Sequence, residues 1–362
     1  MNYIFKYRSA YMGFAIIWII MFHFKAFEGV PILGSFFSLG ELGVDIFLFL
    51  SSFGLCYSLS KDSNTIKFYK RRFIRVIPAW IFLLFLLDIK NKILGYPSPV
   101  NVLQYICYYS GLGWWIRSFV SESHNYWYEW YVPSLMAFYI FTPLLYRKSS
   151  TFIVKCIVLT LIISVFLPVL SLFLHHEQNM GILVQLIDNL HWTYQRVPVF
   201  LSGILFYRFY NNKGYSCEIS EKLPSRLVNI MNMSILGGGK NKAYSFIMIL
   251  ISICIFALTI RIPFLDYTIQ RLTFYWILPS FLFYVGQLFR FNILNNIFSF
   301  IGSFSLELYM IHVVDWPIVV FKMFMYNDNM LLITAVLSCI ILSYITSWIF
   351  KPISKFISKK LL

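Results

Sequence analysis

The feature that most constrains the fold of this chain is a series of long apolar stretches separated by short polar segments. About ten of them are long enough to cross a bilayer as helices; they lie at 9–27, 41–59, 74–90, 128–147, 152–174, 194–210, 244–261, 272–290, 298–320 and 330–350. Only 12% of the residues are charged, about half the share in a soluble domain. The sequence therefore predicts an all-α integral membrane protein, a bundle of about ten transmembrane helices.

The polar segments leave no room for a second domain. The longest runs from 211 to 243, which is shorter than an independent domain usually is. We therefore treat 1–362 as a single transmembrane domain. The stretch 101–116 holds Gly111 and Gly113 and is predicted to be re-entrant or interfacial.

The basic residues indicate the orientation in the membrane. With the N-terminus inside, most of the 30 lysines and arginines fall on segments of the inner side. The positive-inside rule then places both termini in the cytoplasm. The net charge of +15 is explained by this topology, and we expect no nucleic-acid partner because no soluble basic face is available. The cysteines show no metal-ligand spacing, and no metal is expected.

Two ionisable residues lie at matching depth near the outer ends of the first two apolar stretches. They are His23 and Asp45, and Glu41 shares a helix face with Asp45 at i, i+4 spacing. A carboxylate beside an imidazole raises its basicity, as a general base requires. The alternative is that His23 only hydrogen-bonds a backbone carbonyl between helices, although intramembrane ionisable residues are by default functional.

A basic cluster precedes the third apolar stretch. Arg72 and Arg75 are three residues apart and share one helix face, and Arg71 is adjacent. Guanidinium groups bind phosphates in a bidentate manner. The cluster therefore predicts a phosphate site, with contact to anionic lipid headgroups as the alternative.

The ninth apolar stretch carries three ionisable residues. Glu307 is expected near the middle of the membrane, with His312 and Asp315 further out. Each one singly could form an interhelical hydrogen bond. Together they favour a reaction or transport path.

Six segments, in this order, resemble those of the membrane acyltransferase 3 family, integral membrane O-acyltransferases that modify bacterial glycans. They are 13–15 with 22–23, 43–53, 68–78, 130–134 with Tyr139 and Pro143, 196–203, and 301–312. The resemblance extends over nearly the whole chain, from about residue 8 to residue 352.

The resemblance implies acetyl-CoA or another acyl-CoA as cytoplasmic donor and a hydroxyl of a saccharide or lipid-linked glycan as acceptor. His23 corresponds to the family's essential histidine, and Arg72 and Arg75 to its donor-binding pair. We add Asp45, Glu307 and His312 as catalytic candidates and Arg8 and Arg71 as donor-binding candidates. The protein is expected to be a multi-pass protein of the bacterial cytoplasmic membrane, in contact with its lipids; assembly into a homo-oligomer is left open.

The chain departs from the family pattern at two positions. Met12 stands where an arginine is usual, and Arg8, one turn earlier on the same face, could replace it. Leu135 stands where a glutamate is often found. The acyl group and the acceptor are therefore open.

The alternative function is a non-enzymatic carrier or flippase of a lipid-linked saccharide. In a carrier the same ionisable residues would form a transport path. A carrier of this kind predicts inverted repeats with paired broken helices, which the two halves of the sequence do not show.

Overall fold

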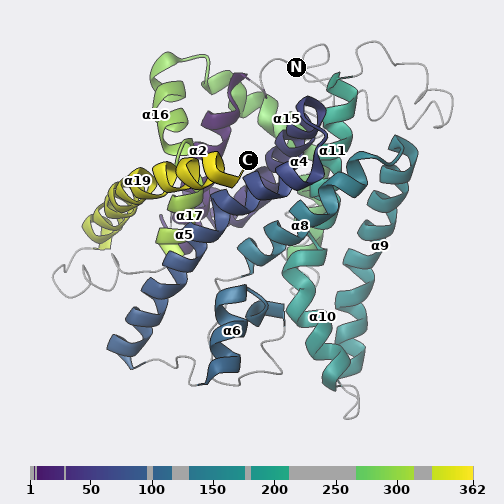
Figure 1. Ribbon diagram of the computed structural model, residues 1–362, viewed down its shortest axis with the longest axis horizontal. Helices are drawn as coiled ribbons and strands as arrows, with labels where there is room; N and C mark the ends of the chain where they lie inside the picture. The colour runs from purple at the N-terminus through teal and green to yellow at the C-terminus, as the bar shows by residue number, and fades with distance from the viewer. Residues whose placement is uncertain are drawn as a thin grey trace.

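The structure, a computed structural model, describes residues 4, 6–27, 30–95, 101–115, 130–175, 181–211, 266–313 and 328–361. Every regular element in these ranges is a helix, which confirms the predicted all-α class (Figure 1). The helices are α2 (Arg8–His23), α3 (Pro31–Ser38), the 3₁₀ turn η1 (Gly40–Leu42), α4 (Gly43–Lys61), α5 (Thr65–Leu94), α6 (Val102–Ser110), α8 (Tyr131–Tyr146), α9 (Ser150–His175), α10 (Gly181–Tyr194), α11 (Val197–Asn211), α15 (Asp266–Leu288), α16 (Asn292–Gly302), α17 (Ser305–Val313) and α19 (Asp328–Leu361).

Within the described residues, three stretches are long and apolar enough to cross a membrane: Pro31–Lys61, Ser150–Ser171 and Leu332–Lys360. Shorter apolar helices cover Arg8–His23, Tyr131–Tyr146 and Ile277–Leu288. The stretch of α9 has few buried side chains although it is strongly apolar, as expected for a helix that faces lipid. The count of ten spans and the cytoplasmic position of both termini stay predictions.

The helices match most of the predicted spans in the described ranges, and the short helix α3 (Pro31–Ser38) lies between two of them. The span predicted at 298–320 is interrupted, because α16 ends at Gly302 and α17 begins at Ser305. A helix that was not predicted, α10, precedes α11 and is separated from it by a turn at Gln195 and Arg196. The stretch 101–116 contains α6, which at nine residues is too short to cross a bilayer. The span predicted at 244–261 lies outside the described residues.

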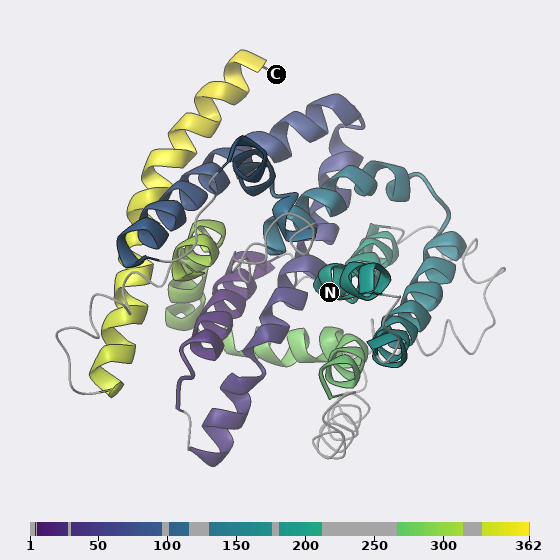
Figure 2. The same cartoon turned by 90° about the horizontal axis from the view of Figure 1, so that it is seen from below.

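Helix α2 lies at the centre of the bundle, beside α4, α16 and α17 (Figure 2). Its residues Ala15, Ile16 and Ile19 are fully buried, as expected for an apolar helix surrounded by other helices. Helices α9 and α10 pack side by side at one edge, and α19 lies at the opposite edge against α5 and α17 (Figures 1 and 2).

Close contact between α2 and α16 depends on glycine. A Cβ added at Gly13 would overlap the backbone carbonyl of Phe298, and one at Gly302 would overlap the carbonyl of Ser9. Small residues at such crossings let two helix backbones approach directly. This crossing holds α16 in place and thereby sets where α17 begins.

We expect Gly13→Ala to destabilise the protein by about 1–3 kcal/mol, because the added methyl group overpacks a backbone contact. The measurement is thermal unfolding of the purified protein in detergent. Gly181→Ala is the matched control, since a Cβ at Gly181 meets nothing within 4 Å. Equal unfolding temperatures for the two variants would contradict this account of the α2–α16 crossing.

Candidate active site

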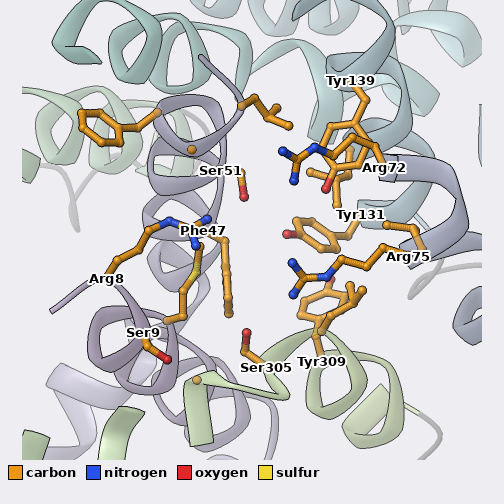
Figure 3. Close-up of a pocket in the computed structure, with 18 of the residues that line it drawn as sticks. Arg8, Ser9, Phe47, Ser51, Arg72, Arg75, Tyr131, Tyr139, Ser305 and Tyr309 are labelled. Carbon is orange, nitrogen blue, oxygen red and sulfur yellow. The ribbon is translucent and has the colours of Figure 1, made fainter. Parts of the chain in front are cut away.

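A cavity of about 350 Å³ lies between α2, α4, α5, α8 and α17. Arg8 and Ser9 reach it from α2, and Arg72 and Arg75 reach it from α5 on the opposite side (Figure 3). The remaining polar groups are hydroxyls, and the rest of the wall is apolar or aromatic. The hydroxyl-bearing residues are Ser9, Ser51, Tyr57, Tyr131, Tyr139, Ser305 and Tyr309.

The first turns of α5 explain why two arginines reach the cavity from one helix. Asn64 caps the helix, accepting a hydrogen bond of 3.0 Å from the backbone N–H of Lys67 on its side-chain oxygen. From this start, Arg72 and Arg75 lie one turn apart on the same face. The predicted pairing of Arg72 and Arg75 is thus confirmed as a geometric arrangement.

The cavity is cationic. No acidic side chain of the described residues lines it, and three guanidinium groups share its space. The Nε atoms of Arg8 and Arg72 are buried and have no hydrogen-bond partner among the described residues, although buried polar groups are nearly always paired. Arg8 makes a long contact of 3.5 Å, from Nη2 to the carbonyl of Leu50. Such a group of like charges with unused donors favours an anionic ligand.

Arg71 is separated from this group. Its guanidinium pairs with the carboxylate of Asp62 at 3.1 Å, and it does not line the cavity. The pKa of Asp62 is lowered by the hydrogen bond from the backbone N–H of Asn64 and by Arg71. The structure therefore does not group Arg71 with the other candidate donor-binding arginines, whereas it does group Arg8 with them.

Helix α17 begins at the cavity. Its first residue, Ser305, lines the wall together with Tyr309 (Figure 3). The positive end of the helix dipole therefore adds to the charge of the arginines. Met12 and Leu135, the two positions at which the sequence departs from the pattern described above, also line this cavity.

His23 and His312 form a pair at the other end of α2. His312 Nε2 lies 3.2 Å from His23 Nδ1, and the ring centroids are 5.0 Å apart. His23 is exposed, whereas His312 is buried. On α17, His312 packs against Tyr309, with ring centroids 5.2 Å apart. A single helix thus connects the cationic cavity to the histidine pair.

Asp45 has a different partner from the one predicted. Asp45 is buried, and its Oδ1 lies 3.6 Å from the Nε of Arg196. The contacts of His23 are instead to Ile19 and His312. The prediction that Asp45 orients His23 is therefore wrong for this structure. The physical reason is that a buried guanidinium needs a carboxylate nearby.

Arg196 belongs to a buried ion cluster with Glu41, Asp45 and Arg271. Glu41 accepts hydrogen bonds from Arg196, at 2.7 Å, and from Arg271. The guanidinium of Arg196 also lies 4.3 Å from the ring centre of Trp130. With two positive and two negative groups, the cluster balances its own charge. Neither arginine was predicted as a site residue, although Arg196 begins the segment 196–203 that carries part of the family resemblance.

The other two predicted residues of the ninth span are Glu307 and Asp315, and neither is among the described residues that form the cavity or the histidine pair. Glu307 is buried on α17 and does not line the cavity. Asp315 lies outside the described residues. Of the catalytic candidates, the structure therefore brings together only His23 and His312.

Fold and site together define a helical membrane protein with a cationic cavity at one end of its central helix and a histidine pair at the other. Residues 13–351 match the family model described as an acyltransferase domain. The chain belongs to the membrane acyltransferase 3 family, and it is therefore a membrane-associated, acyl-transferring enzyme. No curated protein and no solved structure matches it.

Proposed function

We propose that the enzyme is an O-acyltransferase, in the simplest case an O-acetyltransferase, of the bacterial cytoplasmic membrane. It moves an acyl group from acyl-CoA to a hydroxyl of a saccharide or lipid-linked glycan. The observation that carries this proposal is the cavity with three guanidinium groups and no acidic side chain among its described lining residues. Such a cavity suits the phosphates of coenzyme A.

The donor site fits a phosphate ligand in its chemistry. The unpaired Nε atoms of Arg8 and Arg72 offer charged hydrogen bonds that phosphate oxygens accept. The hydroxyls of Ser51 and Ser305 (Figure 3) are additional donors. In this proposal Arg8 supplies the third guanidinium, one turn from Met12.

The distance between Arg8 and His23 suits an extended donor. Arg8 and His23 are fifteen positions apart on α2, which is about 22 Å at 1.5 Å per residue. The pantetheine arm of acyl-CoA is an extended chain that carries its thioester at the far end. With the phosphates among the arginines, the arm would run beside α17, past Tyr309, toward His23.

At the histidine pair, His23 acts as the general base. Its imidazole takes the proton of the acceptor hydroxyl while the oxygen attacks the thioester carbonyl. The C–O bond forms, the C–S bond breaks, and the proton passes from His23 to the leaving thiolate. The exposure of His23 suits access by a large acceptor.

The carrier hypothesis has one observation in its favour. Two helical paths are interrupted, between α10 and α11 and between α16 and α17, and broken helices are common in carriers. Membership of an acyltransferase family weighs more strongly, since it concerns the reaction itself.

The deciding experiment uses proteoliposomes that contain the purified protein, radiolabelled acetyl-CoA outside and a lipid-linked saccharide in the membrane. We expect label in the saccharide, released by mild alkali as an ester should be. Longer acyl-CoA donors, tested in parallel, identify the acyl group. Movement of the saccharide across the membrane without incorporation of label would replace the transferase with the carrier.

A further inference from the structure

The hydrogen bonds around the two histidines determine where their protons lie. His23 Nδ1 is 3.1 Å from the carbonyl of Ile19, and His312 Nδ1 is 3.2 Å from the carbonyl of Leu308. A carbonyl oxygen only accepts, so both Nδ1 atoms carry hydrogen. In the neutral pair, His312 Nε2 is then an acceptor, and the N–H of His23 is shared between Ile19 and His312.

This assignment leaves the Nε2 atom of His23 as the unprotonated nitrogen of an exposed ring. A base must present its lone pair to the substrate, and the partner of the other ring nitrogen fixes which nitrogen that is. His312 is well placed for this role, because it is 1% exposed and is held by Leu308 and by the ring of Tyr309.

We propose that His312 is a positioning residue, which shares with the carbonyl of Ile19 the Nδ1–H of His23, holds the imidazole ring, and thereby directs the Nε2 lone pair of His23 toward the acceptor hydroxyl. The inference rests on the proposed transferase function for its kinetic consequence, but the hydrogen bond itself does not. In this proposal an imidazole fills the position that a carboxylate fills in other base-orienting arrangements, whereas the carboxylates Glu41 and Asp45 lie against Arg196.

The test compares His312→Phe with His312→Gln. Phenylalanine keeps the ring but accepts no hydrogen bond, whereas the side-chain oxygen of glutamine accepts one. We expect His312→Phe to lower kcat about 10- to 100-fold with an unchanged KM for acyl-CoA, and His312→Gln to restore most of kcat. Equal losses in both variants, or a loss confined to KM, would overturn the proposal.

A second measurement does not need acyl transfer. Diethylpyrocarbonate modifies unprotonated imidazole nitrogens, and peptide mass analysis gives the rate at His23. We expect His312→Phe to slow modification of His23 several-fold and His312→Gln to restore it; equal rates in all three proteins would refute the hydrogen bond. If the wild type transfers no acyl group, the proposed function fails, and this rate still decides the role of His312.

Discussion

Replacement of His23 by alanine is expected to lower kcat for acyl transfer by about 10²- to 10⁴-fold, the usual contribution of a general base. The loss follows because His23 Nε2 is the nitrogen that would take the proton of the acceptor hydroxyl in the proposed mechanism. The KM for acyl-CoA should stay near the wild-type value, since Arg8 lies about 22 Å away along α2 and the three cavity arginines, not His23, line the proposed phosphate site. Initial rates with labelled acyl-CoA give both constants.

His191→Ala is the matched control for His23→Ala. His191 is half-buried on α10 and contacts Tyr194 through Nδ1 at 3.3 Å, and it lines no part of the cavity. The His191→Ala variant should therefore keep kcat within a few-fold of the wild-type value. A purified, folded His23→Ala enzyme that keeps full activity would exclude His23 as the base.

The positions of Asp45 and His312 show what could be predicted from the sequence. Apolar spans and charge bias give the depth of a residue in the membrane, and by depth the sequence paired His23 with Asp45 and not with His312. Depth is only one coordinate, because the direction in which a helix presents a side chain depends on its neighbours. Asp45 points to Arg196, which follows it by about 150 positions, and no local pattern reveals such a pair.

The cavity shows the same difference between what local sequence predicts and what depends on packing. Helical spacing was sufficient to place Arg72 and Arg75 on one face, and the structure confirms it. Arg8 joins them from another helix, and this follows from the packing of α2 rather than from its sequence. The break between α16 and α17 escaped prediction because Ser303 and Phe304 do not interrupt the apolar composition; hydropathy measures composition and not backbone continuity.

Charge in the cavity should dominate the affinity for the donor. Hydrogen bonds to charged groups contribute about 1.5–3 kcal/mol each, and about 1.4 kcal/mol corresponds to a factor of ten. Added salt should also weaken donor binding, since part of the attraction is screened. An uncharged thioester with a pantetheine arm but no nucleotide should escape both effects.

We therefore expect the double variant Arg72→Met, Arg75→Met to raise the KM for acyl-CoA by about 10²- to 10⁴-fold, with little change in KM for the pantetheine thioester. Arg71→Met is the control within the same helix, because Arg71 is half-buried, pairs with Asp62 and does not line the cavity. If Arg71→Met weakened the donor as much as the double variant, the effect would come from the overall charge of the inner surface. A loss specific to the cavity-lining pair instead places the phosphates inside the cavity, within reach of Arg8.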